Sequence, residues 1–152
     1  MMTSYFFVLP MVCQLGLSFD MSNSRLFHER LINNKLIHQE KWNELVEDTN
    51  ETVAMKIFEE FIKNLSINNE KLRNNLSEKN FTEIAKICHQ LSSSSQLIGL
   101  VDLGVSFKAL QLKIKKNEEP TSNFQKLEKD VKLALDQIKI ILDLTQVPTK
   151  LN

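Results

Sequence analysis

Glycine, proline and cysteine are scarce in this chain. Its 152 residues include three glycines, three prolines and two cysteines. Because hairpin turns depend on glycine, so few glycines argue against a strand-rich fold with many hairpins. Cys13 and Cys88 have no metal-ligand spacing and are too few for a disulfide scaffold, so we expect a reducing compartment, the cytoplasm.

An excess of charge of either sign is also missing. Basic residues number 19 and acidic residues number 19. This balance argues against a broad nucleic-acid surface, which needs surplus Lys and Arg. The chain contains no glycine-rich phosphate loop, so we expect no ATP binding and no kinase activity of its own. The three histidines, His28, His38 and His89, form no metal-ligand motif, so no metal site is expected.

Charged side chains are absent from the segment between Tyr5 and Phe19. This mostly apolar segment of about 15 residues is shorter than the roughly 18–20 residues of a membrane-spanning helix. No basic region precedes it, as one would in a secretion signal. We therefore expect residues 1–21 to be an extension outside the fold, and no membrane partner. The alternatives are a segment packed loosely on the domain and a membrane anchor or export signal.

Helical periodicity, by contrast, is abundant. Apolar residues recur at helical spacing over residues 22–147, which we take as one domain, and residues 148–152 are expected to be a disordered tail. The pattern predicts helices over residues 24–37, 38–47, 51–76, 81–98, 101–116 and from 121 onward. Four long helices with short connections predict an all-α fold, an antiparallel up-down four-helix bundle preceded by one or two short helices.

Residues that favour helix ends stand at the expected boundaries. Candidate N-terminal caps with side-chain oxygens precede three long helices: Thr49 or Asn50, then Asn80 with Glu83 as its capping-box partner, then Thr121 or Ser122. Gly99 is expected to end the helix over residues 81–98, because glycine adopts the left-handed conformation without Cβ strain.

The stretch from His89 to Gly99 is the most informative part of the sequence. On a helical wheel of about 100° per residue, an apolar face with two serines lies opposite His89: Ile84, Ile87, Leu91, Ser94, Ser95 and Ile98. Polar residues gather on the histidine side: Thr82, Lys86, Ser93 and Gln96, with Ser92 beside them. This pattern suits presenting a histidine to solvent and is unsuited to burying one.

The four consecutive serines are expected to play two roles. Ser94 and Ser95 should face the core, where small side chains let a neighbouring helix approach and hydroxyls bond to the carbonyl one turn earlier. Helical side chains lean toward the N-terminus, so residues one turn after His89 overhang it. Ser92 and Ser93 should therefore leave His89 approachable and offer hydroxyls to an oxyanion.

The spacing His89-x-Leu91-x-x-Ser94-Ser95-x-x-x-Gly99 resembles the signature of histidine-containing phosphotransfer (HPt) domains, commonly His-x-Leu-Lys-Gly-Ser-Ser-x-x-x-Gly. Five positions match across eleven residues. The expected order of helices is similar to that of the family. The resemblance implies that His89 accepts a phosphoryl group and that the other four matched residues are structural.

The resemblance covers about residues 36–145, and residues 36–61 are similar to the start of bacterial single-domain phosphorelay proteins. Two positions depart from the signature. The usual lysine three residues after the histidine is Ser92, and the usual glycine after it is Ser93. Because the lysine is thought to steady phosphoryl oxygens, Ser92 puts the rate of transfer in doubt, and Lys86 is the expected substitute.

By this resemblance the chain is a phosphoryl carrier without enzymatic activity of its own. His89 takes a phosphoryl group from the aspartate of a response-regulator receiver domain and passes it to another receiver. Lys86, Ser92, Ser93 and Gln96 surround the phosphoryl group. The implied partners are receiver domains, which bring the Mg²⁺ ion, and a hybrid sensor kinase, and the chain itself needs no cofactor and is expected to be a monomer.

Two other functions fit the same residues. A degenerate HPt-like module would dock receivers or kinases without carrying phosphate. An unrelated helical bundle that matches the signature by accident would bind other partners, and a buried His89 would favour it.

Overall fold

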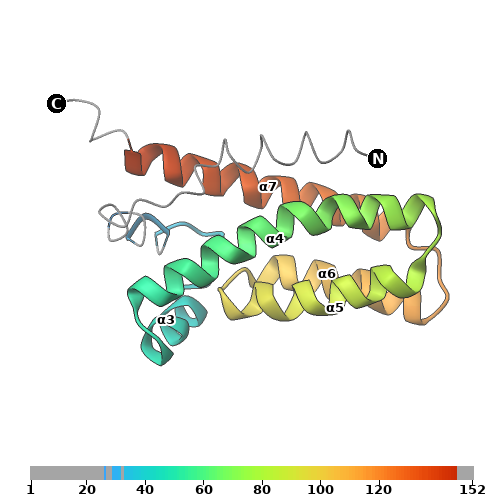
Figure 1. Ribbon diagram of the computed structural model, residues 1–152, viewed down its shortest axis with the longest axis horizontal. Coiled ribbons are helices and arrows are strands. Elements are labelled where there is room, and N and C mark those ends of the chain that lie inside the picture. Colours follow the sequence, from blue (N-terminus) through green and yellow to red (C-terminus); the bar gives the residue numbers. More distant parts are fainter. Residues whose placement is uncertain (1–25, 27–28, 32, 147–152) are drawn as a thin grey trace.

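The computed structural model describes residue 26 and residues 29–31 and 33–146, with side chains as far as Ile141. This part of the chain contains helices and turns and no strand, which confirms the all-α prediction (Figure 1). The expectations for residues 1–21 and 148–152 concern positions outside the described residues.

Five helices have bounds close to the sequence-based ones: α3 (Gln39–Asp48), α4 (Glu51–Ser77), α5 (Phe81–Leu97), α6 (Val101–Lys115) and α7 (Thr121–Gln146). None of the helices in the described residues is both long and apolar enough to cross a membrane.

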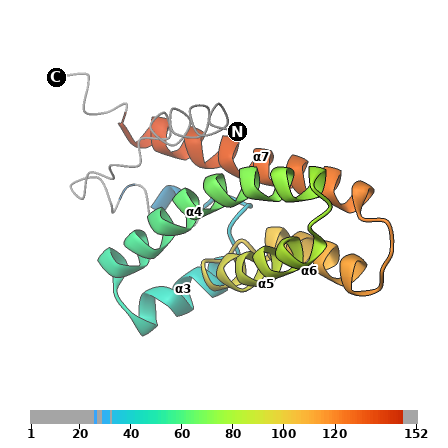
Figure 2. The same cartoon turned by 45° about the vertical axis from the view of Figure 1, so that its right-hand side comes forward.

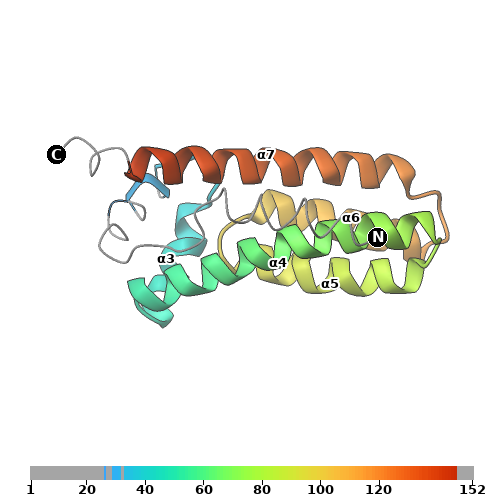
Figure 3. The same cartoon turned by 45° about the horizontal axis from the view of Figure 1, so that its top comes forward.

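The four long helices lie side by side, and each turns back along the preceding one (Figures 1 and 2). Helix α5 packs most extensively against α6, and α6 packs against α7. Helix α4 contacts both α5 and α7, and the shorter α3 lies against the ends of α4 and α5 (Figure 3). The α5–α6 pair, which contains the serine-rich stretch, is therefore the most tightly associated pair.

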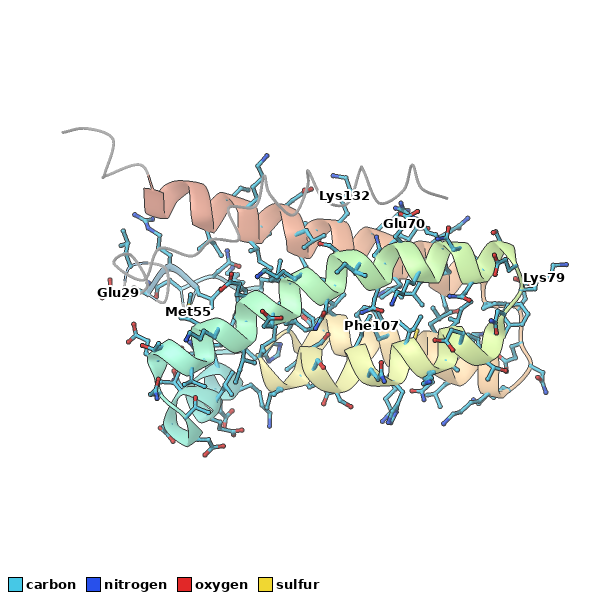
Figure 4. All side chains as sticks on the ribbon, in the orientation of Figure 1. Glu29, Met55, Glu70, Lys79, Phe107 and Lys132 are labelled. Atoms are coloured by element: carbon cyan, nitrogen blue, oxygen red, sulfur yellow. The ribbon has the colours of Figure 1, made fainter. Side chains whose placement is uncertain are left out.

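The core consists of the apolar faces that the periodicity predicts. Phe107 is fully buried and lies between the long helices (Figure 4). Trp42 of α3 packs edge-on against Phe58 of α4, with 5.9 Å between ring centroids, and this contact anchors the short helix. Val53 is an exception among the apolar residues of α4: it is 38% exposed, because it lies in the first turn of the helix at the edge of an open groove.

The helix predicted over residues 24–37 is shorter in the structure than the sequence pattern indicates. Leu31 is helical and fully buried, but residues 33–37 form turns. The side chain of Asn34 accepts a hydrogen bond from the Leu36 N–H at 2.8 Å, which competes with helical pairing. The chain therefore turns at Asn34 before α3 begins.

The predicted N-terminal caps are partly confirmed. Asn50 accepts a hydrogen bond from the Val53 N–H at 2.9 Å. Asn80 accepts one from the Glu83 N–H at 3.4 Å, but its own N–H donates to the Asn75 carbonyl, so the reciprocal half of the capping box does not form.

The prediction that Thr121 or Ser122 caps α7 is wrong. Thr121 is the first helical residue, and the Glu119 carboxylate accepts hydrogen bonds from its N–H and its hydroxyl. These bonds lower the pKa of the Glu119 carboxyl group. Pro120 precedes the helix, and its carbonyl accepts a hydrogen bond from the Phe124 N–H at 2.9 Å. Because the proline ring has no oxygen to accept from the first turn, the Glu119 carboxylate is the side-chain acceptor there.

Three of the helices end in the same way. Lys79, Gly99 and Asn117 have φ values of 57°, 93° and 55° and follow α4, α5 and α6. In each case the next N–H bonds to the carbonyl five residues back, as in Leu100 to Ser95 at 2.8 Å. This is the Schellman motif, which requires a left-handed residue and confirms the prediction for Gly99.

Candidate functional site

His89 is exposed on α5, while the helix buries its opposite face. Leu91 is 4% exposed and Ile84 is 1% exposed. The predicted orientation of the helix is thus confirmed at the histidine. An exposed imidazole on a rigid, well-packed helix is held in place by the backbone and is accessible to another protein.

The residues expected around His89 fall into two groups. Lys86, Ser93 and Gln96 are exposed with the histidine. The Ser93 hydroxyl donates to the His89 carbonyl at 3.3 Å, one turn back on the same helix. Because this short side chain turns toward the backbone, it leaves the imidazole unscreened, as the sequence predicts.

Ser92 does not belong to this exposed group. Its side chain is 6% exposed, and its hydroxyl donates to the Gly104 carbonyl of α6 at 2.9 Å. The expectation that Ser92 offers its hydroxyl to a phosphoryl group on His89 is therefore wrong. The physical reason is the approach of α6, which covers this edge of α5 and supplies a buried acceptor.

The expectation for Ser94 is also corrected, and that for Ser95 is confirmed. Ser95 is fully buried and donates to the Leu91 carbonyl at 2.6 Å. Ser94 donates to the Gln90 carbonyl at 3.0 Å as expected, yet it is exposed. It faces a groove between α4 and α5 that is open to solvent, so no helix covers it.

Gly99 does more than end α5. Its carbonyl accepts a hydrogen bond from the His38 N–H at 2.8 Å, at the start of α3. A Cβ atom here would lie 3.1 Å from both the His38 carbonyl oxygen and Ile37 Cγ2. The glycine therefore provides the left-handed turn and the close contact that seats α3 beside the His89 helix.

Gly104 is a structural residue that the sequence reasoning missed. A Cβ atom at this position would lie 2.9 Å from Gln96 Cγ and 3.1 Å from the Ser92 carbonyl oxygen. The two backbones can thus approach closely only because α6 carries glycine here. A glycine inside an otherwise regular helical pattern, in the first turn of the helix that follows the serine-rich one, was the available signal.

A groove of about 590 Å³ runs between α4 and α5, next to the site. Gln90 and Ser94 line its α5 side, and Val53 and Ile57 line its α4 side. Leu97, which is 54% exposed, also lines it. A partly apolar depression therefore begins one residue away from His89.

Cys88 is the inward neighbour of His89 and is fully buried. Burial raises the pKa of its thiol to about 12, so it is not a nucleophile near neutral pH. In the described part of the chain, no cluster of three or more His, Cys, Asp and Glu side chains could hold a metal ion. His89 is thus accessible from solvent, whereas the neighbouring thiol is not.

No family model, no curated protein and no solved structure matches this chain. The sequence signature and the geometry around His89 are therefore the observations that bear on its function.

Proposed function

We propose that this chain is a histidine phosphotransfer protein with an HPt-like antiparallel four-helix bundle, working in the cytoplasm as a phosphorelay intermediate. The observation that carries the proposal is His89, exposed in the HPt-like signature on a helix whose other face is buried. The order and orientation of α4 to α7 support the bundle assignment.

The transfer step needs little from this chain besides position. A ring nitrogen of neutral His89 attacks the phosphorus of a receiver phosphoaspartate in line. The N–P bond forms while the P–O bond to the aspartate breaks, and its electron pair stays on the carboxylate. The receiver holds the Mg²⁺ ion that stabilises this charge, and the reverse step charges a second receiver. Positioning and charge neutralisation dominate phosphoryl transfer, so a rigid exposed imidazole is sufficient here.

The groove between α4 and α5 supports the same proposal. A receiver must bring its acidic pocket over His89, so part of its surface must lie on adjoining helices. The exposed apolar groups of Val53 and Leu97 beside Gln90 offer such a contact without unfolding any element.

The test uses the full chain and a receiver domain charged with acetyl phosphate. We expect an acid-labile phosphoryl group on His89, located by mass spectrometry, and none on His89→Gln. His38→Gln is the matched control, because His38 is also exposed but lies outside the signature, with its Nε2 atom 3.7 Å from Asp102 Oδ1. Failure of transfer to the wild type, or equal transfer to His89→Gln, contradicts the proposal.

A second candidate is a non-catalytic receiver-binding module. The burial of Ser92 favours it, because the position of the usual lysine points into the α5–α6 contact and not toward His89. This alternative predicts that a receiver binds the wild type and His89→Gln equally in calorimetry, with no phosphorylation of either.

A further inference from the structure

Helices α4 and α7 are close together at one end and diverge toward the other. Arg73 of α4 donates to the Glu128 carboxylate of α7 at 2.9 Å, which holds the narrow end together. From there the helices separate toward the start of α4 in every ribbon view (Figures 1, 2 and 3), and they contact each other far less than α5 and α6 do. We call the α7-facing side of α4 from Met55 to Arg73, together with the facing side of α7, the α4–α7 seam.

The first described residues of the chain lie at the wide end of this seam. Residues 29–31 are between the start of α4 and the end of α7 (Figures 1 and 3), and Glu29 and Met55 are at the same end of the bundle (Figure 4). Leu31 and Met55 are both buried. The chain therefore enters the bundle at the open end of the α4–α7 seam.

Two polar atoms in the middle of the seam are buried without partners. Ser66 and Asn69 lie two turns and one turn before Arg73, so they share the α7-facing side of the helix with it. Ser66 is 5% exposed, and neither its hydroxyl oxygen nor Asn69 Oδ1 has a hydrogen-bond partner among the described residues. Because buried polar atoms are almost always hydrogen-bonded, these two indicate that a further polar group lies over the seam.

The seam has an apolar floor and a rim with charges of both signs. Ile62 of α4 and Leu135 of α7 are buried on the facing sides of the two helices. At the rim, Lys63 pairs with Glu59 at 3.3 Å, and Lys132 is exposed on α7. An apolar floor inside a polar rim is typical of a surface that binds protein. An anionic membrane surface attracts an excess of positive charge, which this rim does not have.

The sequence contains a segment that suits this surface. Tyr5 to Phe19 is uncharged, mostly apolar and about 15 residues long, which corresponds to about 22 Å as a helix. From Met55 to Arg73 the seam runs for about 27 Å along α4. Residues 20–28 connect the segment to the open end, and so short a connection gives an effective concentration in about the millimolar range. A second copy of the chain or a lipid surface has no such advantage.

We propose that the α4–α7 seam is the docking surface for the chain's own apolar segment, Tyr5 to Phe19. The segment covers the apolar floor, and its few polar groups, such as the Gln14 amide, pair with Ser66 and Asn69. Residues 1–21 then contain a segment packed on the domain, which is one of the alternatives that the sequence leaves open. The seam lies across the bundle from the α5–α6 pair (Figure 1), so docking leaves His89 free, and the inference does not depend on the proposed function.

Disulfide trapping in the full-length chain tests the docking. Cys13 lies within the segment, and the other thiol, Cys88, is buried with a pKa of about 12. Lys63→Cys or Glu70→Cys places a new thiol at the rim of the seam, and Lys108→Cys on the exposed face of α6 is the matched control. Equal amounts of unlabelled and isotope-labelled chain are oxidised with copper phenanthroline. Peptide mass spectrometry then measures each disulfide and separates links within one chain from links between two.

We expect the disulfide to Cys13 to form within one chain at least roughly ten-fold faster at either seam position than in the Lys108→Cys control. Adding Leu9→Glu, which puts a charge into the segment, should slow trapping to the control rate, whereas Leu9→Met should not. Equal rates at all three positions overturn the proposal, and a wild type that then sediments with phosphatidylglycerol vesicles assigns the segment to a lipid surface. Links mainly between unlabelled and labelled chains overturn it too, because the seam would then bind a second copy.

Discussion

At the scale of single residues, neighbouring serines in one helix have different surroundings. Ser92 donates across to α6, Ser95 is buried against its own helix, and Ser93 and Ser94 are exposed. All four are serine, so the difference comes from what lies next to each one. Adjacent positions differ in the same way at Cys88 and His89. Burial makes the Cys88 thiol unreactive, whereas His89 is exposed to solvent.

The Ser92 hydroxyl bond should be measurable as stability. Ser92→Ala leaves the buried Gly104 carbonyl without this donor, and we expect a loss of about 1 kcal/mol in the free energy of unfolding. Urea denaturation followed by circular dichroism measures it. Ser94→Ala is the matched control and should change stability by less than about 0.5 kcal/mol, because the hydroxyl is exposed. Equal effects of the two substitutions would show that the bond to Gly104 is not stabilising.

At the scale of helices, three helices end at a residue with positive φ, and the three residues differ in how easily they adopt this conformation. Gly99 adopts a positive φ at little cost, and Asn117 tolerates it, but Lys79 carries a Cβ and a long side chain at φ 57°. Lys79 lies at the turn between α4 and α5, away from the long-helix interior (Figure 4). The α4 end is therefore the least favourable of the three.

Lys79→Gly should stabilise the protein by about 0.5–1 kcal/mol, because it relieves the strain of the left-handed backbone. The free energy of unfolding in urea measures the gain. Asn117→Gly provides the comparison and should give a smaller increase, since asparagine is already accepted in this conformation. A loss of stability in Lys79→Gly would show that the side chain makes a contact worth more than the strain.

At the scale of the whole molecule, close packing of α5 against α6 determines the shape of the site. The contact between Ser92 and Gly104 buries one edge of α5, and the open groove toward α4 leaves the opposite edge free. His89 lies between these edges on the outer surface. A change in the α5–α6 distance would therefore alter both stability and the surroundings of the histidine.

Gly104→Ala tests this packing. Alanine improves helix propensity by about 1 kcal/mol, but its Cβ would lie 3.1 Å from the Ser92 carbonyl oxygen, which belongs to the backbone and cannot turn aside. We expect overpacking of about 1–3 kcal/mol to prevail and lower the melting temperature. Val105→Ala, at a 57% exposed position of the same helix, should leave stability nearly unchanged. A more stable Gly104→Ala would show that the helices move apart freely.

The sequence by itself determined the helices, most of their ends and the outward position of His89. These are local properties: helical periodicity decides which face is apolar, and residues such as Asn50 and Gly99 act on the few backbone groups beside them. The same local rules underlie the resemblance to the HPt signature.

Only the tertiary structure decided which serines of α5 are buried and which are exposed. The helical wheel placed Ser92 with the exposed group and Ser94 with the core, and both assignments were wrong. The wheel describes one helix, whereas burial depends on how near its neighbours come. Gly104 lets α6 cover Ser92, and the α4–α5 groove leaves Ser94 open.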